Sequence, residues 1–422
     1  MKPYAGKSNP RQWFNIFWVA LIIIYAVSLG VILWRFQVPG LLITDFQAFY
    51  ATAQIAETKG FSQVYNLQLQ SQFQQALQNQ NLHGLFQDAF ETVPMPYLPA
   101  FILLFLPVAA LGYFPAYMSW VLLNAALLLL YVFRFSRALG SENGRDLIVK
   151  LLICLPVFSN LVLGQVNVFL LIFLGEFLLA SLRGKDMQSG LWLSLLLLKP
   201  QTLILILPAL LIQRRYKTLS GFALGSAAVF LLSLVLVGPR SLAGLGLLLL
   251  GYVHGLPSNN PEVMMNWRAV AMNLSTFLPG LVAWIIALEG MTLTVVVTLS
   301  MWRKPIDSTS PRFALLLLGT FAGTLSVTWH AHNHMEIMLI PLILYLYARK
   351  MLPWKIIYLW FLAPPVYLAI MFLVSPQNAY GLFGIGSLAV NLILLVWTAR
   401  SLRTPHPIVQ ASSIESTAAH QL

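Results

Sequence analysis

Apolar runs of about 17 to 25 residues, the length that crosses the hydrocarbon core of a bilayer as an α-helix, recur along most of the chain. Examples are Phe14–Trp34 and Phe277–Leu299. A membrane β-barrel would need short segments of alternating hydrophobicity, whereas Leu242–Leu250 is continuously apolar. The 422-residue chain is 59% hydrophobic and 9% charged. It is therefore predicted to be an all-α, polytopic transmembrane protein.

The first run, Phe14–Trp34, follows Lys2, Lys7 and Arg11 and has no small-residue cleavage site behind it. We expect a retained anchor with a cytoplasmic N-terminus. We assign residues 1–403 to a single transmembrane domain and residues 404–422, which lack periodicity, to a disordered cytoplasmic tail. The later candidate spans are Tyr97–Gly112, Pro115–Phe133, Leu147–Leu163, Val166–Leu182, Leu191–Ile212, Leu219–Val237, Phe277–Leu299, Phe313–Trp329, Met335–Tyr347, Trp354–Val374 and Leu382–Thr398.

The basic residues cluster between these spans, which accounts for the net charge of +12 without invoking nucleic acid. If the clusters face the cytoplasm, 20 of the 25 Lys and Arg residues lie inside. The exterior then comprises residues 35–96, 164–167 and 238–276, together with the run of three histidines from His330 to His334. This topology requires Lys199-Pro200 to break the run Leu191–Ile212 into a re-entrant or bent pair.

Three histidines, His330, His332 and His334, interrupt the apolar stretch 313–348. A metal site is the less favoured interpretation, because this spacing puts only His330 and His334 on one helical face and only Glu336 lies nearby. Neutral imidazoles that gain charge near an anion suit a phosphate or a sugar hydroxyl better. A structural histidine cluster at the membrane interface is the alternative.

Lys199 lies in a run of Leu and Ile, where an ammonium costs on the order of 3 kcal/mol unless it meets an anion or water. A phosphate is the natural anion. Pro200 and Gln201 break the helix locally and would open backbone groups to a cavity that holds this anion. The alternative is a lysine that snorkels to the interface.

Asp45 follows the first span, where Thr44 and Gln47 match a capping box that would place Asp45, ionised, in the first turn of a helix. The alternative is a helix N-terminal residue with no catalytic role. We expect this helix and a second one to lie along the outer leaflet and to roof a cavity. Their apolar residues at helical spacing are Phe46, Phe49, Tyr50 and Ala53 in the first, and Leu69, Phe73 and Leu77 in the second.

Other polar residues have two interpretations each. Arg268 beside Trp267 is either a bidentate phosphate ligand or a loop arginine near lipid headgroups, and Arg240 has the same two interpretations. The segment 164–167 is either a tight polar turn or a binder of sugar hydroxyls. Glu176 and Glu289 lie inside predicted spans and need partners that no pattern identifies. The single cysteine, Cys154, rules out a disulfide framework.

An ordered set of motifs runs from Asp45 to about Pro341. It resembles the bacterial polyprenyl-phosphate-mannose-dependent mannosyltransferases of glycosyltransferase family 87, in the GT-C superfamily. The motifs are Thr44-Asp45-Phe46, Pro96-Tyr97-Leu98-Pro99, Gly164-Gln165-Val166-Asn167, Lys199-Pro200-Gln201 followed by Arg214-Arg215, and Trp329-His330-Ala331-His332.

The resemblance implies a GT-C type fold in a bacterial inner membrane, with both termini cytoplasmic and the active site outside. It implies inverting transfer of a hexose, expected to be mannose, from a polyprenyl-phosphate donor to a glycolipid, glycan or protein acceptor. Asp45 would be the general base. Neither a metal nor another cofactor is expected, because cationic side chains meet the leaving phosphate and the chain has no Asp-x-Asp pair. The expected donor-phosphate ligands are Lys199, His330, His332, His334 and Arg268, and the expected substrate contacts are Tyr50, Gln165, Asn167 and Gln201.

A transporter or flippase for an anionic lipid or solute is the main alternative, with cargo bound at mid-membrane by Lys199 and the histidines. Inverted repeats would favour it, and the sequence has no convincing internal repeat. A polymerase or ligase of surface polysaccharide is a third interpretation, and it would require a diphosphate-linked donor.

Overall fold

A computed structural model describes residues 45–81, 92–139, 145–253, 261–374 and 379–403, together with Val19 and Ile23. Every regular element in these residues is a helix, which confirms the predicted all-α class. The predicted first span, apart from Val19 and Ile23, and the predicted tail lie outside the described residues.

The α-helices are α2 (Phe46–Lys59), α3 (Leu67–Asn81), α4 (Pro99–Ile102), α5 (Leu106–Ala109), α6 (Tyr113–Ala138), α7 (Arg145–Leu152), α8 (Leu155–Val162), α9 (Asn167–Leu182), α10 (Asp186–Ser194), α11 (Ile206–Ile212), α12 (Tyr216–Val253), α13 (Trp267–Leu274), α14 (Gly280–Ser300), α15 (Pro311–Val327), α16 (Ile340–Ala348), α17 (Trp354–Val374) and α18 (Ala379–Arg403). Short 3₁₀ helices are η1 (Phe61–Gln63), η3 (Leu195–Leu198), η4 (Pro200–Leu203), η6 (Pro261–Val263) and η7 (Asn333–Leu339).

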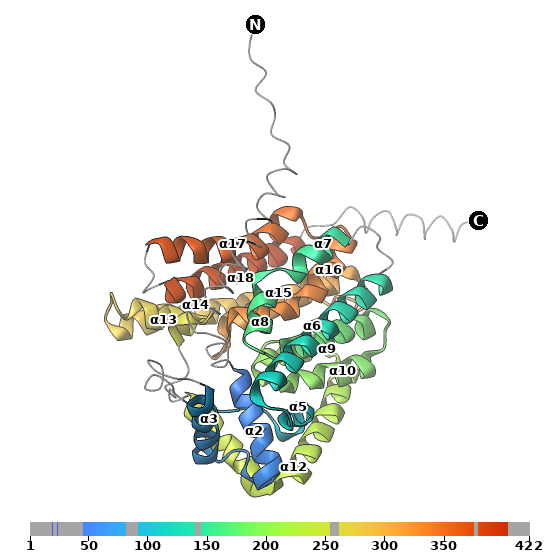
Figure 1. Cartoon of the computed structure of the whole chain (residues 1–422). Coiled ribbons are helices and arrows are strands. Elements are labelled where there is room, and N and C mark those ends of the chain that lie inside the picture. The colour runs from blue at the N-terminus through green and yellow to red at the C-terminus, as the bar shows by residue number, and fades with distance from the viewer. Residues whose placement is uncertain are drawn as a thin grey trace, which may run out of the picture.

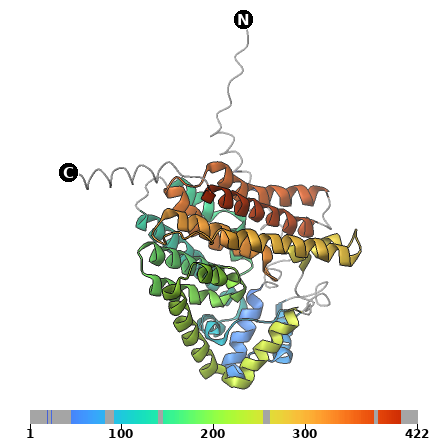
Figure 2. The same cartoon turned by 180° about the vertical axis from the view of Figure 1, so that it is seen from behind.

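The helices form two groups that meet around the predicted motifs. In one group α14, α15, α17 and α18 lie side by side (Figures 1 and 2). In the other, α2 packs against α3 and α5, while α12 packs along α10. Among the described residues, four helical segments are long and apolar enough to cross a membrane: Tyr113–Ala138, Tyr216–Gly251, Gly280–Ser300 and Phe383–Arg403. Shorter apolar helices surround them, so the chain has the character of a polytopic membrane protein.

Some predicted spans are interrupted at residues that break an α-helix. Tyr97–Gly112 contains only α4 and α5, each with a proline in its first turn. Leu191–Ile212 breaks at Lys199-Pro200 as expected, leaving η3 and η4 on either side. The region after Gly238, expected as an exterior loop, instead continues as helix α12 beyond a kink at Gly238-Pro239. The apolar run 242–250 explains this continuation.

The two amphipathic helices of the first loop are more deeply packed than expected. Most of α2 is buried all round, including Phe46, Phe49 and Tyr50, so it lies inside the protein rather than on a lipid surface. Gln47 donates to the Gln74 carbonyl at 2.8 Å instead of turning back to close a capping box, and Thr44 lies outside the described residues. Asp45 is the N-cap residue of α2 and its carboxylate makes no capping bond.

Helix α3 buries glutamines, not only the apolar residues that the sequence singled out. Gln74 donates to the Val93 carbonyl and accepts from the Val93 amide, at 2.8 and 2.9 Å. Gln70 accepts from the Met95 amide at 3.1 Å. Side-chain amides thereby satisfy backbone groups of this non-helical segment. These bonds fix the segment 93–97 beside the start of α2.

Basic residues gather at one end of the bundle. Arg183 follows α9, Arg303 follows α14 and Arg403 ends α18, while Arg312 lies in the first turn of α15. Hydrogen bonds join this end: Arg312 donates to the Leu402 carbonyl, Arg215 to Ile306 and Gln213 to Lys304. The histidine run follows the opposite end of α15, which at 17 residues is about 25 Å long.

Glu176 in α9 has the partner that the sequence could not identify. Its carboxylate accepts two hydrogen bonds from Arg134 of α6, at 2.7 and 3.5 Å. Glu289 in α14 is exposed and has no ion pair or hydrogen bond to any described residue.

Gly164 brings the start of α2 close to the loop after α8. The residue has φ +62°, and a Cβ there would lie 2.6 Å from the Phe46 Cβ. The Phe46 amide donates to the Leu163 carbonyl, and Trp120 Nε1 donates to the Gly164 carbonyl at 2.8 Å. Only glycine permits this backbone conformation together with this contact.

We expect Gly164→Ala to lower the stability by about 2 kcal/mol or more, because the left-handed backbone alone costs an L side chain about 1–2 kcal/mol and the Phe46 contact adds to it. The measurement is the apparent melting temperature in detergent by tryptophan fluorescence. Gly246→Ala is the matched control, since nothing lies within 4 Å of a Cβ at Gly246. Equal melting temperatures for the two variants would contradict the expectation.

Candidate active site

A cavity of about 660 Å³ lies where the two helix groups meet. Segments far apart in the sequence line it: the start of α2, the segment 93–97, the loop before α9, the break between η3 and η4, and the histidine run. The polar lining residues are Asp45, Ser159, Gln165, Lys199, Gln201, His330, His332, Asn333 and His334. Among the described lining residues, the cavity thus contains one carboxylate, one ammonium and three imidazoles.

Gln165 joins the carboxylate to the ammonium. Its Nε2 donates to Asp45 Oδ2 at 2.5 Å, and its Oε1 accepts from Lys199 Nζ at 2.9 Å. Asp45 and Lys199 form no direct ion pair. One neutral amide therefore separates the two charged groups while contacting both.

The loop that carries Gln165 is fixed from several directions. The Gln165 amide donates to the Asn160 carbonyl at 2.9 Å, and the Asn167 amide donates to Asn160 Oδ1 at 3.2 Å. Asn167 Nδ2 in turn donates to the His334 carbonyl at 3.2 Å. The loop thus connects Asp45, Lys199 and the backbone of the histidine run.

Lys199 is 4% exposed and lies at the break that Pro200 enforces. Its Nζ lies 6.0 Å from the Tyr97 ring centroid, on the side of the cavity formed by the segment 93–97. The backbone conformation at Lys199, φ −134° and ψ 84°, is not helical. The proline break thus leaves the ammonium inside the cavity instead of on a lipid-facing helix surface.

The histidines form a row that also lines this cavity. The His330 and His332 ring centroids are 4.8 Å apart, and those of His332 and His334 are 5.5 Å apart. The backbone before α16 is not α-helical here, so all three rings reach one cavity despite their spacing. No three His, Cys, Asp or Glu side chains in the described ranges converge as metal ligands would.

Burial dominates the electrostatics of the cavity. It raises the pKa of Asp45, while the hydrogen bond from Gln165 and the charge of Lys199 oppose that rise. Burial, followed by the charge of Lys199, lowers the pKa of His332 to about 4. Burial, followed by the neighbouring His332 ring and the charge of Lys199, also lowers the pKa of His330. The imidazoles are therefore neutral at neutral pH.

Three of the expected site residues do not line the cavity. Tyr50 donates to the Leu111 carbonyl at 2.6 Å, and Asn167 supports the histidine run from behind. Arg268 lies 4.4 Å from the Trp329 ring centroid, and Trp329 is the residue that reaches the cavity. Arg268 is 5% exposed, and its Nη1 has no hydrogen-bond partner among the described residues.

Sequence reasoning missed the residues that position the site. Glu336 is fully buried and accepts from Asn391 at 2.8 Å and from Asn333 at 3.1 Å, which ties the histidine run to α18. The glutamines of α3 were also missed. The spacing of Gln70, Gln74 and Gln78 at i, i+4 and i+8 was a usable signal, because it puts the three amides on one helical face.

The fold and the cavity define a helical membrane protein with a polar chamber assembled from distant segments. The model of glycosyltransferase family 87 matches residues 96–329, more than half of the 422 residues, so the chain belongs to this family and is a glycosyltransferase. No curated protein and no solved structure gives a match. The matched range includes Gln165 and Lys199 but neither Asp45 nor the histidines, which are linked to it by the cavity.

We expect Lys199→Met to raise the pKa of Asp45, because the variant removes a nearby positive charge that favours the carboxylate. The measurement is an infrared titration of the protonated carboxyl band, assigned by its loss in Asp45→Asn. Lys185→Met, an exposed lysine beyond α9, is the control and should leave the band unchanged. A midpoint that stays in place or falls in Lys199→Met would contradict the coupling.

Proposed function

We propose that this glycosyltransferase moves a hexose, taken to be mannose from the family resemblance, from a polyprenyl-phosphate donor to an acceptor outside the cytoplasm. The observation that carries the proposal is that Asp45, Lys199 and the histidines line one cavity. Inverting transfer from a lipid phosphate needs a base at one end and anion-stabilising groups at the other. Gln165 separates those two ends here.

In this proposal the acceptor hydroxyl lies against Asp45. Its oxygen attacks the anomeric carbon and forms the new glycosidic bond, while Asp45 takes the proton. The bond between the anomeric carbon and the phosphate oxygen breaks, and its electron pair leaves with the polyprenyl phosphate. A single displacement with one carboxylate inverts the anomeric configuration. Gln201, which also lines the cavity, is assigned to the sugar.

The departing phosphate would be met by Lys199 and by the imidazoles. A buried ammonium without a carboxylate partner is a strong anion site, because little water screens it. Neutral histidines donate N–H groups, and their pKa values rise when an anion binds. Arg268 acts on this end through Trp329, whose ring it contacts.

The remaining wall of the cavity suits a lipid carrier. Leu249 of α12, Val263 of η6 and Phe383 of α18 line it with apolar surface. These residues come from both helix groups, beside the same chamber that holds Lys199. An isoprenoid chain entering there would bring its phosphate to the ammonium.

The arrangement of charges supports an active site on the exterior side of a bacterial inner membrane. The basic residues gather at the ends of α9, α14, α15 and α18 that lie away from the cavity. Basic residues concentrate on the cytoplasmic side of membrane proteins. The cavity at the opposite ends would then open outside the cytoplasm.

We expect Asp45→Asn to reduce transfer by about a thousandfold or more while leaving donor binding nearly intact, because a general base is lost and the phosphate end is unchanged. The measurements are product formation from a synthetic polyprenyl-phosphate mannose and equilibrium binding of the same donor. Glu57→Gln, an exposed carboxylate on the same helix, is the control. Substantial turnover in Asp45→Asn would rule out the base role. Lipid flipping in vesicles without glycosidic product would favour the transporter alternative.

We expect Lys199→Met to abolish discrimination between a short polyprenyl phosphate and the corresponding polyprenol. The wild type should prefer the phosphate by about tenfold or more, since a charge-assisted bond contributes roughly 1.5–3 kcal/mol. The measurement is competition of both lipids against a labelled donor. Lys185→Met serves as the control and should retain the preference. If Lys199→Met also retains it, the phosphate lies elsewhere.

A further inference from the structure

Helix α14 (Gly280–Ser300) has two different faces. The face toward the bundle carries small residues: Ala283 and Ala287 are buried, and the position of Gly290 is filled by the Trp267 ring, 2.5 Å from where a Cβ would lie. Thr294 accepts from Trp267 Nε1 at 2.9 Å on the same face. Close backbone approach through small residues is the usual packing of membrane helices. This face of α14 is therefore occupied.

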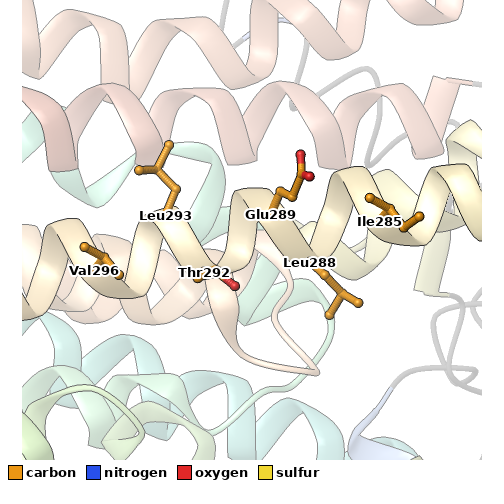
Figure 3. Close-up of a pocket in the computed structure, with 6 residues that line it drawn as sticks. All are labelled: Ile285, Leu288, Glu289, Thr292, Leu293 and Val296. Carbon is orange, nitrogen blue, oxygen red and sulfur yellow. The ribbon is translucent and has the colours of Figure 1, made fainter.

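The opposite face is exposed along the length of the helix. Ile285 is 46% exposed, Leu293 64% and Val296 54%. Together with Leu288, Glu289 and Thr292 they line a shallow, open pocket on the surface of α14 (Figure 3). Among the described residues that line this pocket, Glu289 and Thr292 supply the polar side chains.

Glu289 lies near the middle of this membrane-length helix, as the tenth of its 21 residues. Its carboxylate points away from the helix (Figure 3). No described residue forms an ion pair or hydrogen bond with it, whereas Glu176 is paired with Arg134. Lipid chains offer a carboxylate neither a donor nor a charge, so a group from outside the described fold must compensate it.

The exposed residues also have the spacing of a helix-packing seam. Val282, Ile285, Glu289, Thr292 and Val296 follow one another at intervals of three or four residues. This is the a/d spacing by which two helices pack at a small crossing angle. A single polar residue at such a position selects a partner and its register, because it is satisfied in only one alignment.

We propose that this face of α14 docks a transmembrane helix of another protein, one that carries a lysine or arginine midway along an apolar seam. Two other occupants lack the required charge. A second copy of the chain in symmetric contact would oppose Glu289 with a second carboxylate. The chain's own apolar run Phe14–Trp34 contains no Lys, Arg or His, so it could offer Glu289 a hydroxyl such as that of Tyr25 but no positive charge. The partner would be a component of the membrane that localises or regulates the glycosyltransferase without entering its cavity.

The test is energy transfer between the reconstituted full-length protein and labelled transmembrane peptides. The protein is labelled through Arg303→Cys at the end of α14, since the native Cys154 is buried. The peptides share a Leu-Ala host sequence with Lys, Ala or Glu at the centre. We expect the Lys peptide to associate about tenfold more tightly than the Ala peptide, and the Glu peptide to associate no better than the Ala peptide.

Glu289→Leu should remove the preference for the Lys peptide, and an unchanged melting temperature would show that this variant is folded. Glu57→Gln is the control and should keep the preference. Equal association of the Lys and Ala peptides with the wild type would overturn the proposal, as would a preference that survives Glu289→Leu. Self-association of the protein that Glu289→Leu abolishes would also overturn it, in favour of a second copy.

Discussion

The side-chain amide of Gln165 is the contact on which the site depends. A carboxylate and an ammonium in the same buried cavity would pair directly if nothing lay between them, and each would then neutralise the other. The amide offers each charge a hydrogen bond of the correct polarity, with the nitrogen toward Asp45 and the oxygen toward Lys199. Both groups are stabilised and both stay available to a substrate. The proposed base and anion site therefore require a neutral residue at this position.

Much of the surrounding structure holds that amide in place. Gly164 permits the close contact with α2, Trp120 binds the Gly164 carbonyl, and Asn160 fixes the loop from the other side. Pro200 brings Lys199 to the amide by ending one helix before the next begins. The polar groups of the site thus come from helix ends and breaks, where backbone and side chains leave the apolar helix surfaces.

The sequence predicted the helical class, the break at Lys199 and the convergence of Asp45, Lys199 and the histidines on one cavity, because charges in apolar runs require a common polar chamber. It did not predict that Tyr50 and Arg268 lie outside the cavity lining, because the direction in which a side chain points depends on tertiary packing. The prediction that α2 lies along the outer leaflet was also wrong, because most of this helix is buried. Buried glutamines of α3 bind backbone groups of neighbouring segments, and hydrophobic spacing alone does not reveal such pairs. The helix after Gly238 was missed because Gly-Pro ordinarily ends a helix.

The backbone groups of Val93 and Met95 in the segment 93–97 form hydrogen bonds with glutamine side chains of α3. Val93, Pro94 and Pro96 line the cavity near Asp45, yet the glutamine bonds would persist with other residues at position 93. The backbone position of this segment therefore does not depend on which side chain stands at position 93. Side chains on this wall of the cavity can therefore change without loss of the hydrogen bonds that hold its backbone beside Asp45.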